Sequence, residues 1–335
     1  MSTKTGKQSI LLDPVPSLAS TAAVAGPLEG RGPLGSDFDL VYGDLRAGQK
    51  SFEAAERRML QEACSRALEK GAFNLEEIDY FISGDLLNQI TVSGYSAAAL
   101  GRPYFGLYGA CSTLSLALSW GGMLVAGGGA RTILAATSSH HCSAERQFRY
   151  PTEYGFQRPE QAQWTVTGAA AAVVSAAGEP PRITAVTTGK VIDLGETDSF
   201  SLGAAMAPAA ASTLIMHFQD LQRNPDYYDL IVTGDLGGIG SKLLLSLLAR
   251  SGYYPEQNYN DCGLMIYNPH LQQIGAGGSG CACSGVVVLG HLIRRMRQGE
   301  LQKVLVVSTG ALHSTTTLAQ GESIPAVAHA VALEM

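Results

Sequence analysis

Apolar residues along this chain occur mostly in short runs that alternate with longer helical segments. The run IDYFISGDL at 78–86 and the run YDLIVTGDL at 228–236 share Asp, Gly, Asp and Leu at matching places. Each predicts a buried strand that ends in a Gly-Asp turn. Two further apolar runs, within 127–141 and 297–313, each lead into a polar turn that contains histidine. The pattern therefore indicates a duplicated chain.

The two halves have the same predicted order of elements. Each opens with an apolar strand, near 17–25 and near 182–191, and continues through helices to its histidine-ended strand. Strands that alternate with helices predict an α/β protein whose sheets are largely parallel and covered by helices. The turn residues at 178–181 separate an N-terminal half, 1–179, which carries Cys111, from a C-terminal half, 180–335. We expect co-packed repeats rather than separable modules.

Three long stretches carry no formal charge: 103–130, 199–216 and 262–290. The first is long enough to be considered as a membrane span. Its seven glycines and its four serine and threonine side chains favour a helix buried between two protein layers instead. With shared buried helices between two sheets, the sequence predicts a five-layer α-β-α-β-α sandwich.

Composition narrows the class of protein. Of the 335 residues, 46% are hydrophobic and 16% charged, and the formal net charge is −6, with no basic block. Nucleic acid is therefore not expected as a partner. The N-terminus has no apolar segment typical of a secretory signal, so we expect a reducing compartment. The six cysteines show no CxxC spacing, and neither disulfides nor a metal site are expected.

Cys111 follows Gly109-Ala110 and precedes the uncharged helical run. A thiol at the N-terminal end of a helix lies near unpaired backbone N–H groups and in the positive field of the helix dipole. Such a position can lower its pKa from about 8.5 to roughly 3.5–7.5, and can also form a pocket for an anion. The alternative is an inert cysteine that fills space in the core. Both interpretations stay open at this point.

Histidines form the second candidate feature. His140 and His141 follow the strand of the first half, and His313 occupies the related turn of the second half. Pseudo-symmetry predicts that these turns converge on one cleft. The alternative is a pair of solvated loops.

Two glycine patterns are set aside. GAGGSG at 275–280 matches G-x-G-x-x-G, but HLQQI before it is not a convincing strand. GDLGGIGSK at 234–242 has a serine between glycine and lysine, which breaks the spacing of a phosphate loop, and it predicts a turn followed by a helix.

Duplicated halves with a cysteine before a buried helix resemble the thiolase fold, which thiolases and ketoacyl synthases share. Three longer segments, GACSTLSLAL, TSSHHCSAERQFRYPTEYG and TTGKVIDLGETDSFSLGAAMAPAAAS, resemble more specifically the stage V sporulation AD family of endospore-forming bacteria. This resemblance extends along essentially the whole chain. It implies a thiolase-like fold and a homodimer.

The resemblance places the thiolase-fold nucleophile on Cys111 but does not supply its partners. Where condensing enzymes of the ketoacyl synthase III type carry His-Gln-Ala-Asn, this chain has Asp235-Leu236-Gly237-Gly238, and where they carry Gly-Asn-Thr it has Gly278-Ser279-Gly280. The second cysteine of thiolases corresponds to the turn Thr309-Gly310-Ala311. A positioned acid or base contributes about 10²–10⁴-fold in rate, so condensation is expected to be very slow.

What the resemblance implies instead is binding of dipicolinic acid, pyridine-2,6-dicarboxylic acid, during its uptake with calcium into the developing spore. Backbone donors at Cys111 would face the carboxylates, and histidine or calcium would offset their charge. The fold would direct further residues toward the same cleft, although their alternative role is to cap turns. The residues expected at the site are Cys111, His140, His141, Asp85, Asn88, Asp198, Asp235, Ser279 and His313.

Calcium is expected only as part of the ligand, and no other cofactor is expected. Two rival functions stay open: a condensing enzyme that forms a thioester on Cys111, and a scaffold whose surface assembles membrane proteins of the spore. The resemblance also implies a protein on the cytoplasmic side of the inner spore membrane, peripherally associated with other stage V sporulation proteins.

Overall fold

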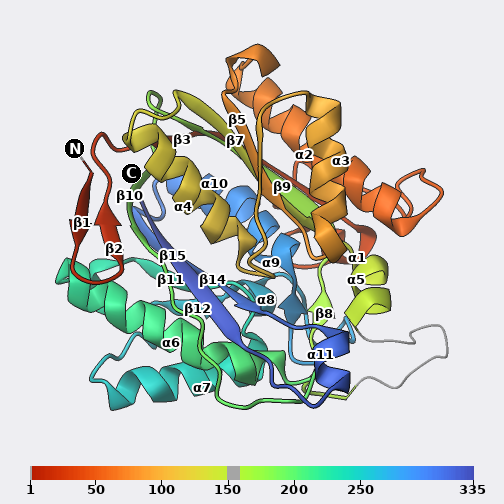
Figure 1. Cartoon of the computed structure of the whole chain (residues 1–335), viewed down its shortest axis with the longest axis vertical. Helices are drawn as coiled ribbons and strands as arrows, with labels where there is room; N and C mark the ends of the chain where they lie inside the picture. The colour runs from red at the N-terminus through yellow and green to blue at the C-terminus, as the bar shows by residue number, and fades with distance from the viewer. Residues whose placement is uncertain (1, 149–158) are drawn as a thin grey trace.

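Two sheet halves with the same strand order form the centre of the molecule (Figure 1). The structure, a computed structural model, describes residues 2–148 and 159–335. In the first half the strands are β3 (Ser17–Ala25), β5 (Tyr80–Gly84), β6 (Tyr104–Gly106), β7 (Thr132–Ser139) and β9 (Gly168–Ser175). In the second they are β10 (Arg182–Thr187), β11 (Leu230–Thr233), β12 (Tyr259–Asp261), β14 (Lys303–Ala311) and β15 (Ala326–Glu334).

The spatial order of the strands confirms the duplication. It runs β3-β9-β7-β5-β6 in the first half and β10-β15-β14-β11-β12 in the second, so each strand has a counterpart at the same place. Along this strand path β3 and β10 are joined by one residue pair, Arg182 with Ser17, which makes one continuous sheet among the described residues. Both predicted Gly-Asp turns follow their strands, β5 and β11, as the sequence indicated.

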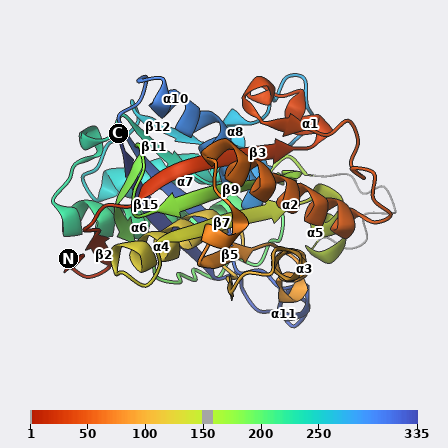
Figure 2. The ribbon, with the colours of Figure 1, turned by 90° about the horizontal axis from the view of Figure 1, so that it is seen from above.

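The sheets are less parallel than expected. β5, β6 and β7 are parallel, but β9 runs antiparallel to both β3 and β7, and β15 has the same relation to β10 and β14 (Figure 2). β9 begins at the end of the sheet where β7 finishes, and β15 begins where β14 finishes. The chain therefore does not cross back to the other end of the sheet between these strands. The opening strand of the second half is also shorter than predicted and ends at Thr187.

Helices cover both faces of both sheet halves (Figure 1). The longer helices are α2 (Phe52–Gly71), α3 (Thr91–Leu100), α4 (Thr113–Ala126), α5 (His141–Phe148), α6 (Leu202–Leu221) and α7 (Gly237–Arg250). The shorter ones are α1 (Pro27–Gly30), α8 (Cys262–Met265), α9 (Cys281–Val286), a π-helix (Val287–Leu292), α10 (Ile293–Arg297) and α11 (Thr315–Ala319). The remaining strands are β1 (Thr3–Thr5), β2 (Ser9–Leu11), β4 (Leu40–Val41), β8 (Trp164–Thr165) and β13 (Gly278–Ser279).

Three hydrophobic clusters separate five layers, which confirms the predicted sandwich. One cluster joins α2 and α3 to the outer face of the first sheet half, and another joins α6 and α7 to the outer face of the second. The third and largest lies between the sheet halves, where α4, α9 and the π-helix pack. The uncharged stretch 103–130 thus contains a helix buried between protein layers, because both of its sides face sheets.

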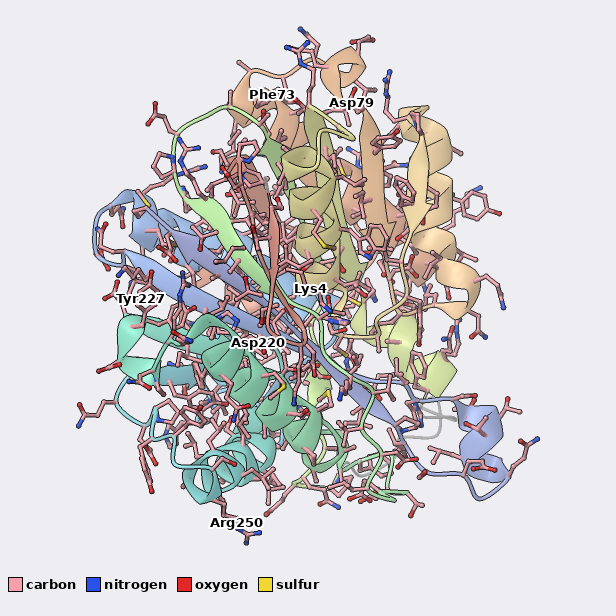
Figure 3. The ribbon with its side chains drawn as sticks, turned by 60° about the vertical axis from the view of Figure 1, so that its left-hand side comes forward. Lys4, Phe73, Asp79, Asp220, Tyr227 and Arg250 are labelled. Atoms are coloured by element: carbon pink, nitrogen blue, oxygen red, sulfur yellow. The ribbon has the colours of Figure 1, made fainter. Side chains whose placement is uncertain are left out.

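The N-terminal hairpin of β1 and β2 belongs spatially to the second half. β2 pairs with β10, and the carboxylate of Asp220 in α6 accepts hydrogen bonds from the backbone N–H groups of Lys7 (2.9 Å) and Ser9 (3.0 Å) (Figure 3). This contact, and the packing of the first-half helix α4 on β14 and β15, make the halves interdependent. The division at 179/180 stays a prediction. In the described part of the chain, every helix is too short or too polar to cross a bilayer.

Candidate functional site

Cys111 lies in a tight turn between β6 and α4. Ala110 before it has a positive φ of 46°, and the N–H of Ser112 after it donates to the carbonyl of Gly109 at 3.0 Å. The helix α4 begins two residues later, at Thr113. The cysteine is only 7% exposed. The turn therefore holds the thiol in the interior, in front of the helix rather than on its first turn.

The end of β14 comes unusually close to this turn. A Cβ atom at Gly310 would lie 2.3 Å from the carbonyl oxygen of Gly109 and 3.0 Å from the backbone nitrogen of Ser112. Only glycine permits that approach. Gly310 belongs to the segment that the resemblance relates to the second cysteine of thiolases. Its close approach brings β14 of the second half against the Cys111 turn of the first.

A cavity opens beside the Cys111 thiol. Its volume, counted together with the open solvent at the mouth, is about 490 Å³. Its walls come from both halves of the chain and are formed by Leu86, Tyr108, Ala110, Cys111, Ala144, Glu145, Phe148, Thr165, Ser199, Leu202, Ser279, Ala311 and His313. A second hollow shares Tyr108, Phe148 and His313 with it, so the two adjoin.

A buried carboxyl group lies behind the cysteine. Asp235, which follows β11, is 1% exposed. Its carboxylate accepts hydrogen bonds from the hydroxyl groups of Ser279 (2.9 Å) and Thr309 (2.7 Å) and from the N–H of Gly280 (3.0 Å). Burial raises the pKa of Asp235, and these hydrogen bonds offset only part of that rise. The Oγ of Ser279 lies 4.0 Å from the sulfur of Cys111.

Of the two interpretations open for Cys111, its surroundings favour the inert, buried thiol. Burial raises the pKa of this thiol well above its ordinary value, and the neighbouring carboxylate of Asp235 raises it further. The positive field of a helix N-terminus falls off within one turn. Here it acts on a thiol that is buried away from water, and burial has the larger effect on its pKa. Cys281 in α9 adds a second buried thiol, whose sulfur donates to the carbonyl of Ala110 at 3.0 Å.

The three histidines do not converge. His140 is buried against Leu45, whose carbonyl lies 2.8 Å from its Nε2, and burial lowers its pKa to about 4. His141 stacks on Trp164, with ring centroids 3.7 Å apart, and lines a different hollow. Only His313 of the three lines the cavity beside Cys111. The turns with His140 and His313 occupy corresponding places in the two halves. In the first half, however, α5 begins directly after His140, and the side chains of His140 and His141 lie away from the cavity.

Two of the predicted acidic residues serve as turn residues. Asp85 is buried and accepts from the N–H groups of Leu87 (3.0 Å) and Ser93 (2.8 Å), which holds the start of α3. Asp198 accepts from the N–H of Phe200 at 2.9 Å and is not among the cavity residues. Asn88 lines the adjoining hollow. Four residues of the predicted set come together. The cavity is lined by Cys111, Ser279 and His313, and Asp235 lies behind Ser279.

Residues that the sequence analysis missed form much of the cavity wall. Ala144, Glu145 and Phe148 come from one face of α5, and the helical spacing of that segment was the signal available. Among the described residues that line the cavity there is no lysine or arginine. Within the described ranges no group of three or more His, Cys, Asp or Glu side chains could hold a metal ion, and all six cysteines are free thiols.

Comparison with known proteins gives the chain a family and a structural class. Residues 6–334 match the family described as Stage V sporulation protein AD (SpoVAD). The Stage V sporulation protein AD of Bacillus subtilis (strain 168) is 49% identical over 330 residues, which cover 98% of this chain and 97% of that protein.

Solved structures of condensing enzymes share the fold at low sequence identity. The 3-oxoacyl-[acyl-carrier-protein] synthase III of Aquifex aeolicus VF5 superposes with a TM-score of 0.58 at 16% identity, covering 84% of each chain. Cerulenin-bound OleA of Xanthomonas campestris superposes with a TM-score of 0.60 at 16% identity, covering 96% of this chain and 100% of OleA. These matches establish an α/β thiolase-like fold.

Proposed function

Because the chain belongs to the Stage V sporulation protein AD family, we propose that it binds dipicolinic acid, free or as its calcium complex, in the cavity beside Cys111. Binding there would serve uptake of dipicolinate into the developing spore and its release at germination. In this proposal the protein does not catalyse acyl transfer.

One observation carries the proposal: a cavity lined by both halves of the chain lies beside a cysteine whose surroundings favour the uncharged thiol. By the resemblance described above, Asp235 and Ser279 correspond to the histidine and asparagine of condensing enzymes of the related type. A carboxylate close to the sulfur opposes formation of a thiolate, and the thiolate is the nucleophilic form. In this proposal the site therefore disfavours the first step of acyl transfer.

The cavity walls suit a planar ring with polar edges. Apolar walls from Leu86, Leu202 and Phe148 can hold a pyridine ring. Tyr108 and Ser199 offer hydroxyl donors for carboxylate oxygens, and burial raises the pKa of Tyr108 to about 12, so its proton stays available.

Charge decides which form of the ligand suits the cavity. Glu145 lines it and Asp235 lies behind Ser279, so a free dianion meets negative groups unless His313 or a bound cation offsets them. Calcium takes oxygen ligands and would neutralise the dipicolinate that carries it. Calcium here is part of the ligand, and the proposal requires no resident metal.

Isothermal titration calorimetry of the full chain tests the proposal, with dipicolinate alone in one arm and with equimolar calcium in the other. We expect saturable binding in at least one arm and at least about a tenfold loss of affinity in His313→Gln, which removes a charge-offsetting donor. His270→Gln, at an exposed histidine outside the cavity residues, is the matched control. Absence of saturable binding in both arms would end the proposal.

The rival function, acyl transfer, predicts a different result. Incubation with acyl-CoA followed by intact-mass measurement would then show an adduct that disappears in Cys111→Ala. We expect no such adduct. Its appearance would favour a condensing enzyme over a binding protein.

Two further parts of the proposal concern partners. We propose a homodimer, and peripheral association with membrane proteins of the spore as the family membership suggests. If the protein were a scaffold only, substitutions in the cavity would leave assembly and spore dipicolinate content unchanged.

A further inference from the structure

A second hollow lies on the far side of the wall that α5 and β8 give to the Cys111 cavity. Trp164 of β8 lines this hollow and the next residue, Thr165, lines the cavity, as expected for neighbours on opposite faces of a strand. His141 of α5 lines the hollow, and Ala144 of the same helix lines the cavity. The volume of the hollow, counted together with the open solvent at its mouth, is about 920 Å³. The two spaces are therefore separated by α5 and β8.

Glu29 of α1 brings a buried carboxyl group to this hollow. The residue is 0% exposed and is one of those that line the hollow. Its Oε1 accepts hydrogen bonds from the N–H of Thr167 at 3.0 Å and from the hydroxyl group of Tyr267. Its Oε2 has no hydrogen-bond partner within residues 2–148 and 159–335. The carboxyl group thus offers one oxygen that the described chain does not use.

The contacts at Oε1 explain how Glu29 holds Thr167 and Tyr267, but they need only one oxygen. A buried polar atom without a partner costs the free energy of removing it from water. Glycine at position 26 leaves room beside Oε2, since a Cβ atom at Gly26 would lie 2.8 Å from it. A ligand group that pairs with Oε2 would offset the cost of burying this atom.

A flat aromatic pair forms another side of the hollow. The rings of His141 and Trp164 stack with centroids 3.7 Å apart and an angle of 4° between their planes. The N–H of His141 donates to the hydroxyl group of Thr167 at 3.0 Å, so the pair is tied to the residue that Glu29 holds. Apolar surface comes from Pro27, Leu28, Leu45 and Leu271. These walls suit a planar ring.

The protonation of Glu29 restricts the polar group that a ligand can bring to it. Burial is the largest effect on the pKa of this carboxyl group and raises it, while its hydrogen bonds lower it. An ionised carboxyl accepts a hydrogen at Oε2, whereas a protonated one donates a hydrogen there. A primary carboxamide has both an N–H donor and a carbonyl acceptor, so it pairs with either form. It is also uncharged, and adds no charge beside Glu29 and Arg31.

We propose that this hollow is a second ligand site, which binds a small aromatic carboxamide with its ring beside Trp164 and its amide at Oε2 of Glu29. The unused oxygen and the aromatic wall together define this class of ligand. The site lies outside the Cys111 cavity, so the proposal stands whether or not that cavity binds dipicolinate.

The fluorescence of Trp164 tests the proposal, with benzamide as the probe. The chain has two tryptophans, so Trp120→Phe leaves Trp164 as the only one. Titration of this full-length variant should give a saturable change with half-saturation at about 1 mM, for a ligand of this size. Toluene has the ring without the amide and should bind at least about tenfold more weakly, because it leaves Oε2 unpaired. No saturable response to benzamide, or an equal response to toluene, would overturn the proposal.

Two variants at Glu29, made in the same background, separate pairing with the ligand from folding. Glu29→Gln keeps a carbonyl oxygen for Thr167 and Tyr267 and offers an amide N–H in place of Oε2, so benzamide affinity should stay within about threefold. Glu29→Leu should lose at least about tenfold in affinity. Undiminished affinity in folded Glu29→Leu would contradict the proposal. If that variant does not fold, the comparison of benzamide with toluene still decides.

Ala144→Leu is the matched control because it fills the Cys111 cavity from α5. Its half-saturation by benzamide should equal that of the background variant within about twofold. A loss of at least about tenfold would place benzamide in the cavity and overturn the proposal. Failure of dipicolinate to bind in calorimetry would leave these results unchanged, so the two proposals fail separately.

Discussion

The hydroxyl groups of Ser115 in α4 and Ser308 in β14 share a buried hydrogen bond of 2.8 Å. The N–H of Ser308 also donates to the Ser115 oxygen at 3.2 Å. The bond joins the central helix of the first half to a strand of the second, three residues before Ala311 at the cavity wall. The position of β14 against the Cys111 turn thus depends on a polar contact between the halves.

Ser115→Ala should destabilise the protein by about 1–3 kcal/mol, because it leaves the N–H and the hydroxyl of Ser308 buried without this partner. Chemical unfolding of the variant and of wild type measures the difference. A double-mutant cycle with Ser308→Ala should show that the two losses are not additive. Additive losses would mean that the two hydroxyl groups act independently.

Filling the cavity should weaken ligand binding without unfolding the chain. Ala144 is 3% exposed and lines the cavity from α5, so Ala144→Leu places three added carbon atoms in the space proposed for the ligand. We expect at least about a tenfold loss of dipicolinate affinity by calorimetry, and an overpacking cost of about 1–3 kcal/mol or less. Ala98→Leu, at an exposed position of α3, is the control. Undiminished binding in Ala144→Leu would place the ligand elsewhere.

Glu56 should make stability depend on pH. This α2 residue is 1% exposed, and burial, with the nearby charge of Asp85, raises its pKa to about 8 from an ordinary value of 4.5. The folded state therefore holds a proton that the unfolded state releases between those values. The stability it contributes is fully present below about pH 4.5 and is lost as pH rises toward about 8, at about 1.4 kcal/mol per pH unit.

Glu56→Gln removes this titration, so its free energy of unfolding should fall less steeply with pH than that of wild type between about pH 5 and pH 8. Chemical unfolding at several pH values measures the two slopes. Glu53→Gln, on the same helix but more exposed, should keep the wild-type slope. Equal slopes for wild type and Glu56→Gln would show that Glu56 titrates as it does in the unfolded chain.

The proposed homodimer has a candidate surface in β6. This strand ends the sheet path of the first half, and its Phe105 is 38% exposed. An unprotected edge with an exposed aromatic residue is suited to pairing with a second copy. Phe105→Lys should shift sedimentation from dimer to monomer, whereas Tyr254→Lys, at a 67% exposed tyrosine in another region, should not. An unchanged dimer in Phe105→Lys would exclude this edge as the main contact.

Local patterns in the sequence were sufficient to predict the elements and the duplication. The run 17–25 is β3 at the predicted bounds, and the Gly-Asp runs are β5 and β11 in corresponding places. The uncharged run after Cys111 contains the buried helix α4. These features follow from side-chain spacing and turn chemistry, which neighbouring residues encode by themselves.

Only the tertiary structure decided which side chains meet at the cysteine. His140 and His313 end corresponding strands, yet α5 turns His140 toward Leu45 while His313 remains at the cavity. Asp235 comes to Cys111 from a strand more than a hundred residues away, and with burial it raises the pKa that the helix start alone would lower. Charge and solvent exposure at a site depend on long-range packing, and no local pattern contains that information.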